Sequence, residues 1–201
     1  VGLVVGVLLL PAALRLGDGR PHGGGDGIGV QHHQSLCVAG GPADGLDEGL
    51  VGAEKTDVDL LEIARKTANS LQSVASKNDI TISVAGESSC VKGVYDIIDE
   101  MVYNLCDNAV KYNRPGGSVN ITVENKTITV ADTGIGIPLS SQPRVFERFY
   151  RVDKSRSKST GGTGLGLAIV KHIVAAHKNA SLSLTSEPGK GTCIRVAFKM
   201  K

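Results

Sequence analysis

Two asparagines and a lysine recur on one side of an otherwise apolar stretch. Asn104, Asn108 and Lys111 follow i, i+4, i+7 spacing, so on a helix their side chains leave the same face. Amide and ammonium groups in such a row could line a cavity and bond a ligand there, whereas a polar network inside the core is the alternative. The apolar positions of the stretch would supply its buried surface: Val94, Ile97, Ile98, Met101, Val102, Leu105, Ala109 and Val110.

A carboxylate beside two glycines stands at the end of a predicted strand. The glycines that follow Asp132, Gly134 and Gly136, let another group approach the backbone closely. A fixed, buried carboxylate at this place could accept a hydrogen bond from an amine such as that of adenine. Taken alone, the segment could also be a plain turn.

A glycine-rich run at residues 161–166 opens a predicted helix. Free backbone N–H groups and the positive end of the helix dipole at such a start suit a phosphate group. The polar segment before this run is not a strand, which disfavours a Rossmann dinucleotide fingerprint, and the Walker A pattern is absent from the sequence.

A basic segment, residues 139–160, separates the two glycine segments. A basic loop bounded by glycines is suited to closing over polyphosphate, although a solvated surface loop is the commoner outcome for such a charge run. Two of the three phenylalanines lie within residues 145–151, which suggests an anchor that docks the loop. The basic residues of the loop are Arg144, Arg148, Arg151, Lys154, Arg156 and Lys158.

The spacing of apolar residues predicts the elements that position these groups. Residues 56–59 resemble a capping box that begins a helix ending near Lys77. Further along the chain we expect strand 80–85, a short edge near Cys90, helix 93–113, a hairpin of strands 119–123 and 128–130, helix 163–177, and strands 181–186 and 192–198. This mixture predicts an α+β fold, a two-layer sandwich with helices on one face of a mixed sheet.

The composition changes abruptly near residue 55. Residues 1–54 hold more than half of the 26 glycines and no Lys, Thr, Asn, Met, Phe or Tyr. Because such a segment buries little apolar area, we expect residues 1–55 to be poorly ordered or not native to a domain formed by residues 56–201. The apolar run 1–14 is shorter than the roughly 20 residues that span a bilayer, and we expect the chain to be a fragment.

Charge and cysteine content narrow the function classes. The chain of 201 residues has a net charge of +2, with 22 basic and 20 acidic residues, so no overall field would recruit nucleic acid. The four cysteines share no C-x-x-C spacing, which disfavours zinc and a disulfide framework and predicts reduced thiols in a cytosolic setting. Any binding of anions must therefore be local.

Taken together, the polar segments resemble the N, G1, F and G2 boxes of the catalytic ATP-binding domain of bacterial sensor histidine kinases, in the GHKL superfamily. The resemblance covers about residues 56–201 and rests on residues 104–112, 132–136, 146–149 and 162–167. It implies the Bergerat-type fold, with three helices covering one face of the mixed sheet. This fold is shared with gyrase-type, heat-shock and mismatch-repair ATPases.

The resemblance implies binding of ATP and Mg²⁺. Asn108 would ligate the metal ion with Asn104 lining the same site, because amide oxygens suit a hard cation without adding negative charge. Lys111 would contact phosphate, Tyr112 would lie near the nucleotide, and Asp132 would read the adenine amine. The glycine segments would meet the base and the phosphates through Gly134, Gly136, Gly162, Thr163, Gly164, Leu165 and Gly166.

The implied reaction is transfer of the γ-phosphoryl group to a histidine. Arg148 or Arg151 would steady the charge that develops on the moving group. In the related ATPases a glutamate that acts as the hydrolytic base stands where this chain has Asn104, and an amide fits transfer to a side chain instead of water. Glu100, one turn earlier, is a candidate to assist the acceptor, with ordinary surface charge as the alternative.

None of the five histidines has the sequence context of a phosphoacceptor on a helical hairpin. We therefore expect a catalytic domain that does not phosphorylate itself and whose partners are a separate histidine hairpin domain and, through it, a response regulator. The resemblance also implies a cytoplasmic domain of a membrane-anchored homodimer. A nucleotide-binding regulatory module without catalysis and a serine kinase of the same superfamily remain alternatives.

Overall fold

A computed structural model describes residues 36–39, 54–152, 163–177 and 179–199. The chain divides into two units, Val1–Ser35 and Leu36–Lys201. The first unit lies outside the described residues, and the second contains the helices and strands of the described residues.

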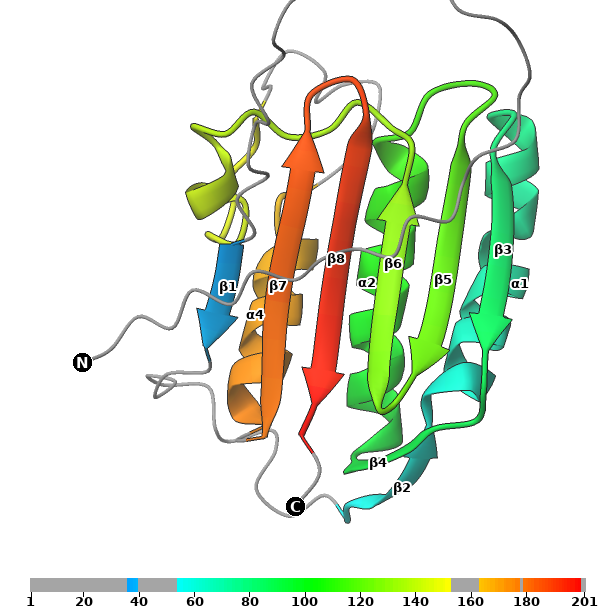
Figure 1. The fold of residues 1–201 in the computed structure, drawn as a ribbon, viewed down its shortest axis with the longest axis vertical. Coiled ribbons are helices and arrows are strands. Elements are labelled where there is room, and N and C mark those ends of the chain that lie inside the picture. Colours follow the sequence, from blue (N-terminus) through cyan, green and yellow to red (C-terminus); the bar gives the residue numbers. More distant parts are fainter. Residues whose placement is uncertain (1–35, 40–53, 153–162, 178, 200–201) are drawn as a thin grey trace, which may run out of the picture. The chain divides into compact units, whose positions relative to one another are not determined.

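A six-stranded sheet forms one layer of the second unit, in the order β1-β7-β8-β6-β5-β3 (Figure 1). Only β3 and β5 pair in parallel; the other neighbours are antiparallel. The strands are β1 Leu36–Ala39, β3 Thr81–Gly86, β5 Ser118–Glu124, β6 Thr127–Asp132, β7 Ala180–Glu187 and β8 Gly191–Phe198. The predicted mixed sheet is thus confirmed, and the two hairpins β5–β6 and β7–β8 make up its centre.

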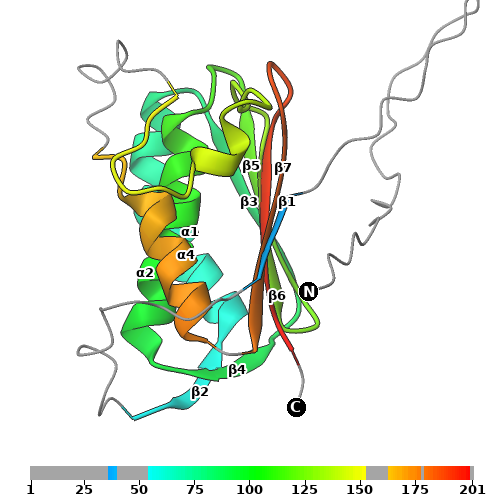
Figure 2. The same ribbon diagram turned by 90° about the vertical axis from the view of Figure 1, so that its left-hand side faces the viewer.

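Three α-helices of the described residues form the second layer on one face of this sheet (Figure 2). They are α1 Leu60–Lys77, α2 Tyr95–Lys111 and α4 Gly166–Ala176, and a short 3-10 helix, η2, spans Gln142–Arg144. Helix α2 lies between α1 and α4 and packs against β5 and β6. The predicted two-layer sandwich with helices on one face is confirmed.

The core lies between the two layers, where the helical and strand periodicities meet. On α2, Ile98, Met101 and Leu105 are at most 1% exposed. On β5, Val119 and Ile121 alternate with polar residues and are equally buried. The prediction for the start of α2 was partly wrong, because the helix begins two residues later than expected and the residues before Ile98 keep some exposure.

The capping box predicted at residues 56–59 is wrong. These residues form β2 Thr56–Asp59, which pairs antiparallel with β4 Cys90–Gly93 as a separate two-stranded sheet. The N-cap of α1 is Asp59, whose Oδ1 accepts hydrogen bonds from the N–H groups of Leu61 at 2.9 Å and Ser89 at 3.1 Å. One carboxylate therefore caps the helix and fastens the loop that precedes β4.

The N-terminal predictions fall mostly outside the described residues. Residues 1–35 and 40–53 are not described, so the apolar run 1–14 and the boundary near residue 55 stay predictions. Leu36–Ala39 lies within the segment expected to be poorly ordered and forms β1 against β7. Within the described part of the chain, no helix is both long and apolar enough to cross a membrane.

Replacing Asp59 with alanine should lower the free energy of unfolding by about 1–2 kcal/mol, because a helix cap and a loop contact are lost together. Burial raises the pKa of Asp59, but hydrogen bonds from Ser88 and from backbone amides outweigh it and hold the pKa below its usual value. The stabilisation should therefore be full above about pH 4 and be lost as the pH falls further. Urea denaturation followed by circular dichroism measures both effects.

Asp57→Ala is the matched control on the same strand. Asp57 pairs with Lys92 at 2.9 Å, with both side chains more than 60% exposed, so its loss should cost less than about 0.5 kcal/mol. Equal losses for the two variants would contradict the capping role of Asp59.

Candidate functional site

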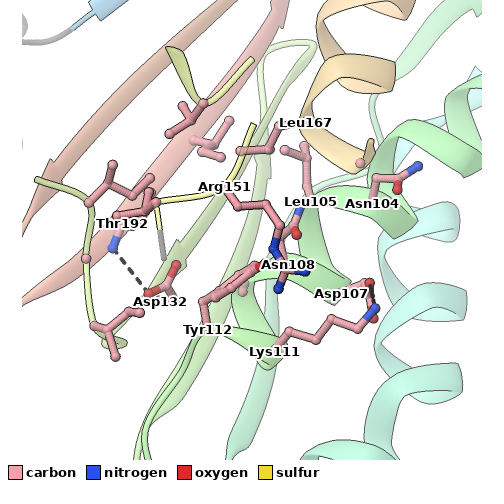
Figure 3. Close-up of a pocket in the computed structure, with 18 of the residues that line it drawn as sticks. Asn104, Leu105, Asp107, Asn108, Lys111, Tyr112, Asp132, Arg151, Leu167 and Thr192 are labelled. Carbon is pink, nitrogen blue, oxygen red and sulfur yellow. Dashed lines mark hydrogen bonds and ion pairs between the residues drawn. The ribbon is translucent and has the colours of Figure 1, made fainter. Parts of the chain in front are cut away.

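A pocket of about 510 Å³ opens between α2, the start of α4 and one end of the central strands (Figure 3). Apolar side chains such as Val130, Ile137 and Ile194 form part of its wall, and polar groups project from both layers. The volume lies within the usual range for small-molecule sites.

The polar row of α2 lines the pocket as the spacing predicts. Asn104, Asn108 and Lys111 are all lining residues. The Nδ2 of Asn104 donates to the backbone oxygen of Glu100 at 2.9 Å, which orients its carboxamide. The Nζ of Lys111 forms an ion pair with Asp107 Oδ2 at 2.6 Å.

Helix α4 begins directly against this row. A methyl group at Gly166 would come within 3.0 Å of Asn104 Oδ1 and 3.2 Å of Asn108 Nδ2, so glycine permits the close approach of the two helices. The N-cap residue, Leu165, makes no side-chain cap hydrogen bond, and the first turn has no acidic residue. The N–H groups of the first turn, which have no partner within a helix, therefore begin beside the two amides.

Asp132 stands at the opposite end of the pocket, where β6 ends. Its Oδ1 accepts hydrogen bonds from the N–H groups of Gly134 at 2.8 Å and Thr192 at 3.2 Å, the second of which is drawn in Figure 3. Burial raises the pKa of Asp132 to about 6, against the opposing effect of these two backbone bonds. The carboxylate is thus ionised at neutral pH, fixed in direction and partly removed from water.

The glycine segment after Asp132 is tied to both neighbouring elements. The N–H of Ile135 donates to the backbone oxygen of Tyr112 at 3.0 Å, and the N–H of Gly189 donates to the oxygen of Ile135 at 2.8 Å. Gly136 has φ of +68°, and any side chain there would collide with the carbonyl of Glu187. The segment therefore requires glycine to pass between α2 and the β7–β8 turn.

A buried glutamine braces the same wall, and the sequence patterns did not reveal it. Gln142 is 4% exposed, and its Nε2 donates to the backbone oxygens of Ile137 at 3.0 Å and Ser186 at 2.9 Å. The Oγ of Ser186 accepts from the N–H of Ile137 at 2.8 Å. These bonds join the segment after Asp132 to β7.

The segment from η2 to Val152 brings one aromatic ring and one arginine to the pocket. Tyr150 and Arg151 are lining residues, and the guanidinium of Arg144 lies 4.4 Å from the centre of the Tyr150 ring. The predicted anchor is only half right, because Phe146 is 4% exposed but Phe149 is 70% exposed. Residues 153–160 of the predicted basic loop lie outside the described residues.

Phe149 combines an exposed ring with a left-handed backbone. Its φ is +62°, and its N–H donates to the backbone oxygen of Gly164 at 2.9 Å. This bond brings the middle of the segment 139–160 beside the second glycine motif.

The pocket brings together most of the residues predicted from sequence. Those that line it are Asn104, Asn108, Lys111, Tyr112, Asp132, Gly136, Arg151, Thr163, Gly164 and Gly166. Those that do not are Glu100, Arg148, Gly134 and Leu165, and Gly162 lies outside the described residues. Glu100 and Arg148 are exposed, and Gly134 serves the site through its hydrogen bond to Asp132.

Besides Gln142, three contributors were missed by sequence reasoning. Thr192 acts through its backbone, which leaves no side-chain pattern to find. Tyr150 was noticed only as part of an aromatic cluster. Asp107 stands four residues before Lys111, a spacing that predicts an ion pair on a helix and could have been found.

The donor set at the α2 end fits a hard cation bound together with phosphate. Among the described residues, no group of three or more His, Cys, Asp or Glu side chains could hold a metal ion. The amides of Asn104 and Asn108 offer neutral oxygen ligands, and both line the pocket. Mg²⁺, which keeps several water and phosphate ligands, suits such a site.

Together, the two-layer sandwich and the pocket between its helices and one end of its sheet are typical of a class of protein, the ATPase domains of this fold. Residues 93–201 match a family model described as histidine kinase-, DNA gyrase B- and HSP90-like ATPase. The chain belongs to this family, which confirms the resemblance of its sequence motifs.

Similar proteins include sensor histidine kinases. The chain is 41% identical over 143 residues to the sensor histidine kinase YkoH of Bacillus subtilis, a match that covers 70% of the chain and 31% of YkoH. The mycobacterial sensor histidine kinase MprB has a structure with a TM-score of 0.58 and 31% identity, covering 71% of this chain and 95% of that one. Full-length ShkA in complex with AMPPNP gives a TM-score of 0.60 and 26% identity, covering 75% of this chain and 33% of ShkA.

Asp132→Asn should make the ligand-free domain more stable at neutral pH. The amide keeps an oxygen for both backbone hydrogen bonds and removes a partly buried charge. Because the folded pKa of about 6 exceeds the unfolded value, the parent loses stability as the pH rises from about 4 to 6. We expect an advantage of roughly 1–3 kcal/mol for the variant at pH 7 that nearly vanishes at pH 4.

Chemical denaturation at several pH values measures this difference, with Asp57→Asn as an exposed control of the same charge change. A variant less stable than the parent at pH 7 would show that the ionised carboxylate stabilises the fold and that desolvation is not the dominant effect.

Proposed function

We propose that this chain binds Mg-ATP in the pocket and acts as the catalytic domain of a sensor histidine kinase in two-component signalling. The observation that carries the proposal is the row of Asn104, Asn108 and Lys111 against the uncapped start of α4, with the carboxylate of Asp132 at the other end. The chain spans 31% of the length of YkoH, so the activity of a whole kinase is part of the proposal.

The base of the nucleotide would lie at the Asp132 end. An ionised carboxylate accepts hydrogen bonds only, so it favours the exocyclic amine of adenine over a carbonyl at that position. The two backbone amides that fix Asp132 leave its second oxygen, Oδ2, to face the base. Tyr112 and apolar lining residues such as Ile137 would cover the faces of the ring.

The phosphates would lie between α2 and the start of α4. Mg²⁺ held by Asn108, with Asn104 beside it, would neutralise charge on the phosphate oxygens. The N–H groups at the start of α4, reached through Thr163 and Gly164, would bond the phosphates, and Lys111 would add a positive charge. The complex of ShkA with AMPPNP supports, by similarity, the binding of a nucleotide by this chain.

The reaction would be a single displacement at the γ-phosphorus. A nitrogen of the acceptor imidazole forms a bond to phosphorus while the bond to the β,γ-bridging oxygen breaks, and ADP leaves with that electron pair. Arg151, which lines the pocket, or the exposed Arg148 would stabilise the charge on the moving group. Glu100 would assist the acceptor imidazole from the exposed side of α2.

The acceptor would belong to a separate hairpin domain, since no histidine of this chain has the required context. Of the two that are described, His172 lies in α4, and the ring of His177 packs against Phe198 with its Nδ1 2.9 Å from the backbone oxygen of Ile173. The phosphorylated hairpin would then pass the group to a response regulator. The names of relatives such as YkoH favour a parent protein that senses a signal, in our proposal as a membrane-anchored homodimer.

ATP binding should depend on the ionised form of Asp132. In calorimetric titrations at pH 7.5, Asp132→Asn should weaken binding at least about tenfold, because the amide presents a donor or a weaker acceptor to the adenine amine. Affinity of the parent should also fall as the pH drops below about 6, where Asp132 gains a proton. If the affinity for ATP falls equally in both proteins at low pH, the cause is protonation of the nucleotide and not of Asp132. Equal affinities of the two proteins at pH 7.5 would refute the adenine assignment.

Phosphoryl transfer should require the amide of Asn108. With Mg²⁺, γ-labelled ATP and a separately expressed histidine hairpin, we expect the parent chain to label the hairpin and not itself. Asn108→Ala should reduce labelling by about 10–100-fold through the loss of a metal ligand. Asn120→Ala is the control, because Asn120 is exposed on β5 and does not line the pocket.

Three outcomes would redirect the proposal. ATP binding without any labelling of the hairpin would identify a regulatory module. Labelling of a serine would identify a serine kinase of the same superfamily. Label on the isolated chain would contradict the expectation that it lacks an acceptor.

A further inference from the structure

The ion pair of Asp107 and Lys111 is unusual for a pocket that would bind polyphosphate. The two residues stand one turn apart on α2, and the Nζ of Lys111 lies 2.6 Å from Asp107 Oδ2. Both side chains line the pocket, with Asp107 20% and Lys111 37% exposed. In Figure 3 the side chain of Lys111 runs along α2 towards Asp107 and away from Asp132.

A carboxylate at this position opposes a bound anion in two ways. It repels phosphate oxygens through space, and it occupies the ammonium group that would otherwise bond them. Because Asp107 precedes Lys111 by four residues, the pair has the favourable orientation on a helix, yet such partly exposed pairs are weak. A phosphate group can therefore take the ammonium from the carboxylate at small cost.

We propose that Asp107 is a positioning residue that holds Lys111 in a standby position and lowers the affinity of the pocket for polyphosphate. The inference rests on the proposed binding of ATP. When ATP binds, the ammonium of Lys111 moves from Asp107 to a phosphate oxygen, and when the nucleotide leaves, the ion pair reforms. The lower affinity for polyphosphate favours release of ADP and its exchange for ATP after each transfer.

A different role for the same carboxylate predicts the opposite result. Asp107 is adjacent to Asn108, the proposed metal ligand, so it could bond a water molecule of bound Mg²⁺. In that case its removal would weaken the binding of Mg-ATP. The sign of the change in affinity therefore separates the two roles.

Helix α2 contains a matched control. Asp99 forms an ion pair with Lys66 on α1 at 2.9 Å, at a site that does not line the pocket. Asp99→Asn therefore makes the same change of charge on the same helix and also frees a lysine. It should leave the affinity for every nucleotide unchanged.

The test is a double-mutant cycle in which ATP, ADP and adenosine are titrated into the parent, Asp107→Asn, Lys111→Met and the double variant at fixed Mg²⁺ and ionic strength. We expect Asp107→Asn to lower the Kd for ATP roughly three- to tenfold and to leave adenosine unaffected. Lys111→Met should raise the Kd for ATP about tenfold. In the Lys111→Met background, the added Asp107→Asn should lower the Kd by a clearly smaller factor than in the parent, because no ammonium remains to be released and only the through-space repulsion is relieved.

Other outcomes overturn the inference. If Asp107→Asn tightens ATP binding equally with and without Lys111, the effect of Asp107 is through-space repulsion alone. Weaker Mg-ATP binding by Asp107→Asn would assign Asp107 to the metal site. An unchanged affinity would show that Asp107 has no role in nucleotide binding. A parent chain that binds ATP in any of these cases leaves the proposed function standing, whereas a parent that binds no nucleotide would refute both.

Discussion

The carboxylate of Asp132 is the point on which the pocket depends. Its two hydrogen bonds, from the N–H groups of Gly134 and Thr192, come from segments about 60 positions apart in the chain and join the ends of the two hairpins. Neither bond uses a side chain of the donor residue, so the position of the acid is set by the backbone of the sheet itself. The energetic cost of this arrangement is desolvation of a charge, seen in a pKa raised to about 6. In the proposed function, this carboxylate would recognise the amine of a neutral base. A fixed acceptor that is partly removed from water distinguishes a hydrogen-bond donor from an acceptor better than a solvated one does.

Helix α2 carries the second constraint, since one helix must fill the core and also form the polar wall. Met101 and Leu105 are at most 1% exposed, whereas Asn104, between them, faces the pocket. The rotation of about 100° per residue separates the two faces without any break in the helix. The close approach of α4, which glycine at residue 166 allows without crowding Asn104 and Asn108, then places a helix start beside the polar face. Packing of the core and geometry of the site are therefore not independent, because a rotation of α2 would spoil both.

Local patterns predicted the parts of this arrangement that depend on periodicity. The β5–β6 hairpin, the amphipathic α2 and the helix after the glycine run all follow from the spacing of apolar residues and turn residues. The strand at Thr56–Asp59 could not be predicted in this way, because its partner β4 lies about 30 residues away and its last residue also has the signature of a helix cap. The role of Thr192 could not be predicted either, because it acts through a backbone N–H, which every residue except proline has. Phe146 and Phe149 are identical in type and three residues apart, so residue type alone could not predict that Phe146 is buried and Phe149 exposed.

Two carboxylates in a pocket for an anion would oppose its binding, and the pocket resolves this by giving them different partners. Asp132 is bound by neutral backbone amides, keeps its full charge and stands at the end away from α4. Asp107 is paired with a lysine on the next turn of the same helix, so the pair is nearly neutral at a distance. At the α2–α4 end, the first turn of α4 has no acidic residue, and the side chain of Arg151 is directed towards α2 in Figure 3. In the proposed function, this separation would set the direction of the nucleotide, with its base at the Asp132 end and its phosphates at the start of α4.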